Sequence, residues 1–180
     1  MKLYIGCGKD IREGYLNLDI AKLPGVDIVW DLSKLPLPFK DGEVDEILTI
    51  NLFEHMDYVP LMKELHRILT PGGKLIITVP HFTSYNNASD PTHRSIGFAV
   101  RTFCFFAKDN PLIDWNIRDY YFDYSFSKME TLQIIFSPNF PFNWVIEFIV
   151  NAHHNIQLGY EFTGLSRLFP AESVYTVLIK

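Results

Sequence analysis

A short apolar strand that runs directly into a glycine turn is the feature that most constrains how this sequence can fold. Residues 2–5 read Lys-Leu-Tyr-Ile, residues 6–8 read Gly-Cys-Gly, and the next apolar segment, residues 15–19, ends in Asp19. Glycine lets the backbone approach a ligand closely, and an acid at the end of a neighbouring strand can accept hydrogen bonds from ribose hydroxyls. The layout is therefore typical of an α/β sheet that binds an adenosyl group.

The composition predicts one globular domain. The chain has 180 residues, of which 48% are hydrophobic and 21% are charged, so we expect a single domain spanning residues 1–180 around one core. A net charge of -5 gives no support for a nucleic-acid-binding surface. Aromatic residues make up 15% of the chain and mostly follow residue 80, which predicts a thick core, an apolar pocket or an exposed face for a partner.

The cysteines and the apolar segments favour a cytoplasmic protein. Cys7 and Cys104 lie far apart, at a spacing that suggests neither a zinc site nor a disulfide framework, so reduced thiols are expected. The sequence begins directly with a predicted strand, and no signal peptide is expected. The most apolar late segment, residues 144–150, is too short and too charged to span a bilayer, so no membrane insertion is expected.

Apolar runs alternate with turn signals through the first half, as in a parallel sheet with crossover helices. In one clear unit, Leu61, Leu65 and Ile68 recur at helical spacing, and residues 70–73, Thr-Pro-Gly-Gly, end this helix before the next strand. The first crossover is much shorter, because residues 9–14 can form at most a single helical turn. The strands expected in this half are residues 2–5, 15–19, 26–31, 44–50 and 74–80.

The second half predicts further elements around an aromatic core. The run of Phe103, Phe105 and Phe106 is expected to be core rather than a substrate platform. The expected elements are a polar loop at 81–97, a helix at 98–107, paired strands at 120–124 and 129–136, a helix at 144–150 and a final strand at 173–179.

Several segments match a known family pattern. They are residues 5–8 (Ile-Gly-Cys-Gly), 18–19 (Leu-Asp), 30–32 (Trp-Asp-Leu), 51–55 (Asn-Leu-Phe-Glu-His), 67–75 (Arg-Ile-Leu-Thr-Pro-Gly-Gly-Lys-Leu), 90–93 (Asp-Pro-Thr-His) and 160–180. Together they resemble the class I S-adenosylmethionine-dependent methyltransferases, in particular small ones from bacterial surface-polysaccharide gene clusters. The resemblance covers nearly the whole chain. It implies a Rossmann-like α/β sheet, mostly parallel with an antiparallel final strand, helices on both faces, and S-adenosyl-L-methionine as cofactor.

Two features depart from that pattern. The family usually has further residues, often helical, that cap the pocket before the first strand, and it usually has a full helix after that strand. Here the first expected strand begins at residue 2, and the crossover after it is short. We therefore expect an open pocket, or one covered by a second copy in a homodimer or by a partner protein.

The resemblance assigns the cofactor to the carboxyl ends of the first four strands, where ligands of open α/β sheets bind. The glycine turn would pass under the methionine part, and Asp19 would take the ribose hydroxyls. Asp31 and the Leu32 backbone would meet the adenine, unless Asp31 merely caps the following turn. Asn51 and Leu52 would lie beneath the sulfonium. The full cofactor set is Gly6, Cys7, Gly8, Asp19, Ile20, Asp31, Leu32, Asn51 and Leu52.

The resemblance implies methyl transfer to a hydroxyl of a small molecule or a sugar. Such a reaction requires the acceptor to be positioned, and a general base assists it. His93, with Asp90 three residues before it, is one candidate base, and His81 directly after the fifth strand is another. The residues expected to contact the substrate are Glu54, His55 and Arg94.

Other interpretations remain open. His81, Asp90 and His93 could form a two-histidine, one-carboxylate metal site, but nothing in their spacing forces them onto one face, so no metal is expected. A nicotinamide-dependent enzyme is disfavoured, because Ile11 stands where the third glycine of Gly-x-Gly-x-x-Gly would fall. The chain could also be a non-catalytic module of the same fold that binds a partner protein.

Overall fold

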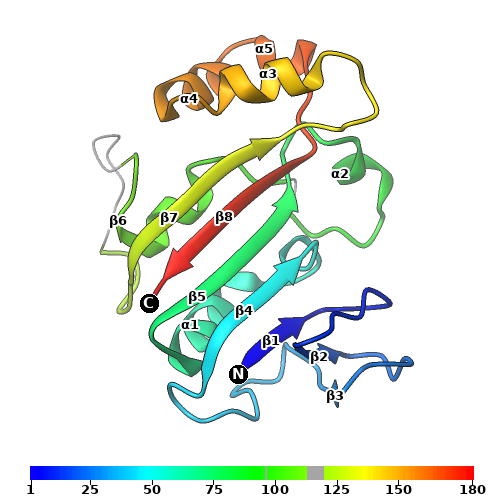
Figure 1. Cartoon of the computed structure of the whole chain (residues 1–180), viewed down its shortest axis with the longest axis vertical. Coiled ribbons are helices and arrows are strands. Elements are labelled where there is room, and N and C mark those ends of the chain that lie inside the picture. The colour runs from blue at the N-terminus through cyan, green and yellow to red at the C-terminus, as the bar shows by residue number, and fades with distance from the viewer. Residues whose placement is uncertain (96, 113–119) are drawn as a thin grey trace.

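The computed structural model describes residues 1–95, 97–112 and 120–180, and one eight-stranded sheet crosses it (Figure 1). The strands are β1 (Lys2–Ile5), β2 (Leu16–Asp19), β3 (Ile28–Val29), β4 (Val44–Ile50), β5 (Leu69–Pro80), β6 (Ala107–Asp109), β7 (Phe126–Ile135) and β8 (Ser173–Ile179). The α-helices are α1 (Tyr58–Ile68), α2 (Tyr85–Ser89), α3 (Asn143–Val150), α4 (His154–Phe162) and α5 (Leu165–Leu168). Two short 3₁₀ helices are η1 (Phe53–His55) and η2 (Thr102–Phe106).

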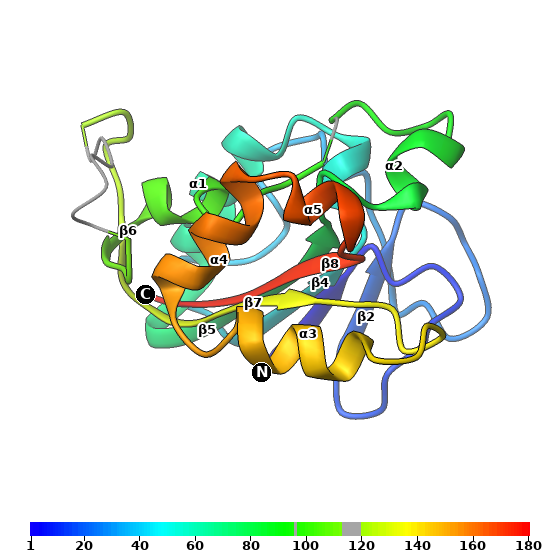
Figure 2. The same ribbon diagram turned by 90° about the horizontal axis from the view of Figure 1, so that it is seen from above.

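The sheet is mostly parallel, in the order β3-β2-β1-β4-β5-β8-β7-β6. The first five strands pair in parallel, and β8 runs antiparallel to both of its neighbours, β5 and β7. Figure 2 shows α1 and α4 on one side of the sheet and α3 on the other. The predicted Rossmann-like sheet with an antiparallel final strand is confirmed.

The first half has the predicted order of strands and helix, but β3 covers only residues 28–29 of the predicted 26–31, and β5 already begins at Leu69 rather than at residue 74. In α1, Leu61, Leu65 and Ile68 are buried against the sheet, and β4 and β5 flank this helix in the chain as a parallel pair. By contrast, residues 6–15 between β1 and β2 form loop and turn without a helix. The prediction that this crossover contains at most one helical turn is therefore confirmed.

An aromatic cluster fills the core beneath the carboxyl end of β4. The ring of Phe103 stacks on Phe98 at 5.7 Å between centroids and lies 6.2 Å from Phe53, which in turn stacks on Tyr58 at 5.5 Å. Phe53 and Phe103 are fully buried. Because Phe53 belongs to η1, this cluster holds η1 firmly at the sheet edge.

The helix predicted at 98–107 is wrong. Its first residues are extended instead, because Phe98 donates its N–H to the Pro80 carbonyl and accepts from the Phe82 N–H. Residues 102–106 form only the 3₁₀ helix η2, and Ala107 then pairs in parallel with Phe126 at the sheet edge. Sheet hydrogen bonds outweigh the weak helix propensity of an aromatic run.

The strand predicted at 129–136 is confirmed, because residues 129–135 belong to β7, but the partner strand predicted at 120–124 is wrong. Residues 120–124 are irregular, and one long strand, β7, pairs with β8 along most of its length. The predicted loop 81–97 contains the short helix α2. The helices α4 and α5 were not predicted; α4 begins after His153, whose side chain accepts a hydrogen bond from the Asn155 N–H.

A buried ion pair joins α1 to the loop before β4. Glu64 is 8% exposed and accepts the Leu37 N–H at 2.6 Å. Arg67 donates to both of its carboxylate oxygens, at 2.9 and 2.6 Å, and also to the Phe39 carbonyl. The hydrogen bonds from Arg67 hold the pKa of Glu64 below its usual value.

We expect Glu64→Gln to destabilise the fold by about 2 kcal/mol at pH 7, because Arg67 then loses a charged partner in a partly buried site. The folded-state pKa of Glu64 is lowered, so its contribution is present above the unfolded value of about 4.3 and is lost as pH falls through the folded value. Urea denaturation at pH 7 and at pH 3 measures this, with the exposed Glu13→Gln as control. An equal loss of stability at both pH values would contradict the account.

Candidate functional site

The glycine turn after β1 is tied to β2 by its backbone. Gly6 and Cys7 both donate their N–H groups to the Leu18 carbonyl, at 2.8 and 3.2 Å. Gly6 has φ +67° and Gly8 has φ +52°, a left-handed conformation that glycine adopts without strain. A Cβ at Gly8 would meet nothing within 4 Å, so the turn faces open space there.

Asp19 lies directly beside this turn, at the end of β2. Its Oδ2 accepts the Gly8 N–H at 2.8 Å, and its Oδ1 accepts the Ala21 N–H at 2.9 Å. Each carboxylate oxygen has two lone pairs, so Asp19 keeps capacity to accept further hydrogen bonds from hydroxyl groups. The neighbouring Ile20 is exposed.

Asp31 follows β3 and caps a turn. Its Oδ1 accepts from the Ser33 N–H at 3.0 Å and from the Ser33 hydroxyl at 2.7 Å, and these bonds lower the pKa of Asp31. Leu32 is buried in the core. The turn-capping alternative for Asp31 is thus observed, and a role toward an adenine stays a prediction.

The end of β4 meets the glycine turn from the other side. Asn51 has φ +49° and donates its N–H to the Thr78 carbonyl. The side chain of Leu52 packs on Gly6, where an added Cβ would lie 2.8 Å from Leu52 Cδ1. The predicted cofactor residues therefore line the carboxyl ends of β1, β2, β3 and β4, as expected for an open α/β sheet.

We expect Gly6→Ala to destabilise the fold more than Gly8→Ala. Both substitutions force a positive φ, at about 1–2 kcal/mol. Gly6→Ala must in addition displace Leu52, whereas Gly8→Ala meets open space. Guanidinium denaturation of the two variants compares them directly. A Gly8→Ala variant that is the less stable of the two would show that Leu52 does not pack as described.

A polar pocket of about 240 Å³ opens at the ends of β4 and β5. Its lining residues are Asn51, Glu54, His55, Pro80, Asn86, Ser89, Asp90, His93, Glu172 and Ser173. Five of the predicted site residues thus come together here: Asn51, Glu54, His55, Asp90 and His93. Arg94 is exposed and not among these lining residues, but its backbone N–H donates to the Glu54 carbonyl at 2.7 Å.

Of the three acidic residues that line this pocket, Glu54 is buried and has a carboxylate oxygen without a hydrogen-bond partner. Glu54 is 1% exposed, and burial raises the pKa of its carboxyl group to about 7. Its Oε2 has no hydrogen-bond partner. The backbone of residues 94 and 95 satisfies the Glu54 carbonyl instead of its side chain.

Two histidines lie beside Glu54. Their rings meet edge to face, with 4.7 Å between the centroids of His55 and His93. His55 Nδ1 lies 2.9 Å from the Thr92 hydroxyl, which donates to Asp90 at 2.6 Å. His93 Nε2 lies 3.8 Å from Asp90 Oδ2, and His93 Nδ1 is buried without a partner.

His81 is not part of this pocket. It is fully buried, with Nδ1 2.7 Å from the Thr83 hydroxyl and Nε2 3.2 Å from Glu161 Oε1 on α4. The structure therefore does not bring His81 together with Asp90 and His93, either as a base or as a metal ligand. Its role is to connect β5 to α4. Glu161 was missed, because no local pattern links residues that lie 80 positions apart.

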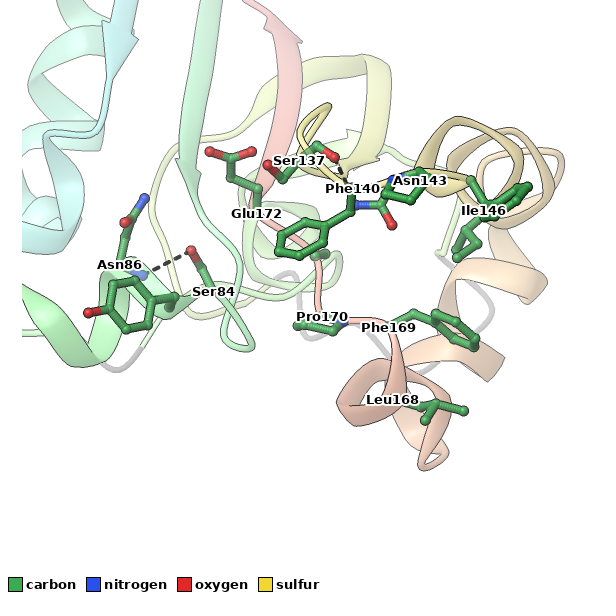
Figure 3. Close-up of a pocket in the computed structure, with 14 residues that line it drawn as sticks. Ser84, Asn86, Ser137, Phe140, Asn143, Ile146, Leu168, Phe169, Pro170 and Glu172 are labelled. Atoms are coloured by element: carbon green, nitrogen blue, oxygen red, sulfur yellow. Dashed lines mark hydrogen bonds between the residues drawn. The ribbon is translucent and has the colours of Figure 1, made fainter.

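A second, apolar pocket has a volume of about 570 Å³, and Figure 3 shows the residues that line it. Its lining residues are Ser84, Tyr85, Asn86, Ser137, Phe140, Pro141, Phe142, Asn143, Ile146, Leu168, Phe169, Pro170, Ala171 and Glu172. Asn86 and Glu172 line both pockets. An apolar pocket was one of three alternatives predicted from the aromatic content of the second half, and its lining residues were not predicted.

Among the described residues, no helix is both long enough and apolar enough to cross a membrane. The most apolar late segment, residues 144–150, belongs to the eight-residue helix α3.

Comparison with known proteins gives matches in sequence and in fold. Residues 3–77 match the family model of a methyltransferase domain. An uncharacterized protein of Methanocaldococcus jannaschii is 49% identical over 87 residues, which are 41% of this chain and 38% of that protein. A probable S-adenosylmethionine-dependent methyltransferase of Mycolicibacterium smegmatis is 33% identical over 107 residues, which are 49% of this chain and 41% of that protein. The chain thus matches about two fifths of the length of these relatives.

The fold agrees with a solved structure along its length. A S-adenosylmethionine-dependent methyltransferase from Archaeoglobus fulgidus superposes with a TM-score of 0.54 and 18% identity, covering 99% of this chain and 85% of that one. At this identity the likeness concerns the fold alone.

Proposed function

We propose that this chain, which has the class I methyltransferase fold and matches the methyltransferase domain model over residues 3–77, transfers a methyl group from S-adenosylmethionine to a hydroxyl group of a small molecule or a sugar. The observation that carries the proposal is the carboxylate of Asp19 at 2.8 Å from the N–H of Gly8, at the open edge of a parallel sheet. The bacterial surface-polysaccharide resemblance is the reason for including sugars.

The residues present fit the cofactor. The turn at Gly6 to Gly8 has two positive φ angles and leaves the space above Gly8 free, which suits close approach of the methionine part. Asp19 has lone pairs left for the two ribose hydroxyls. Asp31 and Leu32 would border the adenine, and Asn51 with Leu52 would lie under the sulfonium.

The adjoining polar pocket suits the acceptor. S-adenosylmethionine supplies an already activated methyl group, so the chain has to orient the acceptor and keep water out. Asn51 lies both in the proposed cofactor site and in the lining of the polar pocket, so an acceptor oxygen held there would sit next to the methyl donor. His93, whose Nε2 lies 3.8 Å from Asp90 Oδ2, is the proposed group that takes the hydroxyl proton.

The apolar pocket supports an acceptor with an apolar portion. It shares Asn86 and Glu172 with the polar pocket, so one molecule could place its hydroxyl in the first and its apolar body in the second. Ligand sites are commonly built this way, with a large apolar lining and a few placed polar groups.

A second candidate is a non-catalytic module that binds a partner protein or a second copy. The observation in its favour is the exposed aromatic surface around α3, where Phe142 is 71% exposed and Trp144 and Phe148 are each 76% exposed. Turnover with a hydroxyl acceptor would decide for the enzyme.

We expect Asp19→Asn to weaken S-adenosylmethionine binding by roughly tenfold to a hundredfold, because it removes charged hydrogen bonds to the ribose. Methyl transfer, measured as S-adenosylhomocysteine formed with a panel of sugar and small-molecule alcohols, should fall with it. Calorimetry measures the affinity, with Glu13→Gln as a control that removes a charge from the loop between β1 and β2.

The control variant should bind and turn over as the unmodified chain does. Unchanged affinity in Asp19→Asn would sink the proposed cofactor site. Binding of S-adenosylmethionine without turnover of any acceptor in the panel would favour the non-catalytic module.

A further inference from the structure

We propose that Glu54, His55 and His93 bind a divalent metal ion on the floor of the polar pocket. One ligand atom from each of the three residues lies within 4.8 Å of the others. Imidazole and carboxylate ligands sit about 2.0–2.2 Å from an ion such as zinc, so two ligands of one ion are at most ~4.4 Å apart. Three ligands around one ion at tetrahedral angles are about 3.4 Å apart, so side-chain shifts of about 1 Å would bring all three into coordination.

Two buried polar atoms of this cluster have no hydrogen-bond partner, which also supports a bound ion. Glu54 Oε2 and His93 Nδ1 are both buried and both lack a hydrogen-bond partner. Buried polar atoms in folded proteins are nearly always satisfied, so two orphans in one cluster call for a missing partner. A carboxylate oxygen and an imidazole nitrogen both offer lone pairs, and a cation accepts from both.

The surroundings of the two histidines fit metal ligands. A histidine that binds a metal through one ring nitrogen usually has its other nitrogen held by a carboxylate, a hydroxyl or a carbonyl. His55 Nδ1 contacts the Thr92 hydroxyl, which leaves Nε2 for the metal. His93 Nε2 faces Asp90 at 3.8 Å, which leaves the unpartnered Nδ1. Thr92 also donates to Asp90, so the hydroxyl that contacts His55 is connected to the carboxylate that faces His93.

The charge of the pocket favours a cation. Glu54, Asp90 and Glu172 line it, and none of its lining residues is a lysine or an arginine. Glu54 is 1% exposed and its Oε2 has no hydrogen-bond partner, so an ionised carboxylate would lack compensation there. A bound cation would supply that compensation.

The ligand set indicates the kind of ion and its use. Two imidazoles and one carboxylate suit zinc, manganese, iron or cobalt, and three protein ligands leave positions open to the pocket, as in catalytic sites. The use rests on the proposed function: the acceptor hydroxyl would occupy an open position, and its pKa would fall. Its proton passes to water, the new O–CH₃ bond forms as the S–CH₃ bond breaks, and S-adenosylhomocysteine leaves. When the metal ion is bound, His93 is one of its ligands and does not act as the general base.

The test is titration of the chelator-treated chain with Co²⁺, followed by visible absorption, and with Zn²⁺, followed by calorimetry. We expect one equivalent of either ion to bind. Mutation of groups that merely support ligands weakens metal affinity about 10–100-fold, so Glu54→Gln and His93→Asn should lose at least roughly tenfold. His153→Asn is the matched control, because asparagine can replace its helix-capping role at α4 and it lies outside the cluster.

The metal site would be overturned if the unmodified chain bound neither ion detectably. It would also be overturned if Glu54→Gln and His93→Asn bound the ion as tightly as the unmodified chain does. Circular dichroism checks that each variant is folded, and His55→Gln replaces any variant that is not. Binding of S-adenosylmethionine is measured on the same samples without metal. Metal binding without S-adenosylmethionine binding would support this site and overturn the proposed function, and the converse result would do the reverse.

Discussion

The parallel pairing of β1 with both β2 and β4 is the constraint on which the whole site depends. Ile5 at the end of β1 is in register with Leu18 on one side and Thr49 on the other. The three strands therefore end at the same level, and the chain must turn three times within a small area. The glycine turn, Asp19 and Asn51 are the residues that come after those ends. Their proximity is a consequence of strand register rather than of local sequence.

The polar pocket at the carboxyl ends of the strands depends on packing by residues from the second half of the chain. The ring of Phe103 holds Phe53, and Phe53 fixes the short helix that carries Glu54 and His55. The turn at residues 90–95 then closes over Glu54, with two backbone N–H groups on its carbonyl. The buried polar groups are thus positioned by an apolar cluster whose formation is driven by the burial of its aromatic rings. The aromatic content of the chain thus positions the polar pocket as well as the core.

Much of this could be predicted from the sequence, and the remainder could not for physical reasons. The five strands of the first half, the final strand, α1 and the glycine turn depend on local spacing and were predicted, whereas β6 was not. Of the candidate residues in the polar pocket, Glu54, His55, Asp90 and His93 were named, but their mutual contact required the fold.

His81 was placed with them because it follows β5. Pro80 lines the polar pocket, and the His81 ring instead contacts Glu161 on α4. Side chains alternate along a strand, so a difference of one position is enough to separate them. The helix at 98–107 failed similarly, since hydrogen bonds to Pro80 and Phe82 are invisible in the local sequence.

A crystal structure of the chain with S-adenosylhomocysteine tests the central claim most directly. The account predicts ribose hydroxyls within hydrogen-bond distance of Asp19, the homocysteine part over residues 6–8, and the sulfur beside Asn51 at the mouth of the polar pocket. Density for the ligand elsewhere, for example only in the apolar pocket between α3 and the segment at residues 168–172, would contradict it.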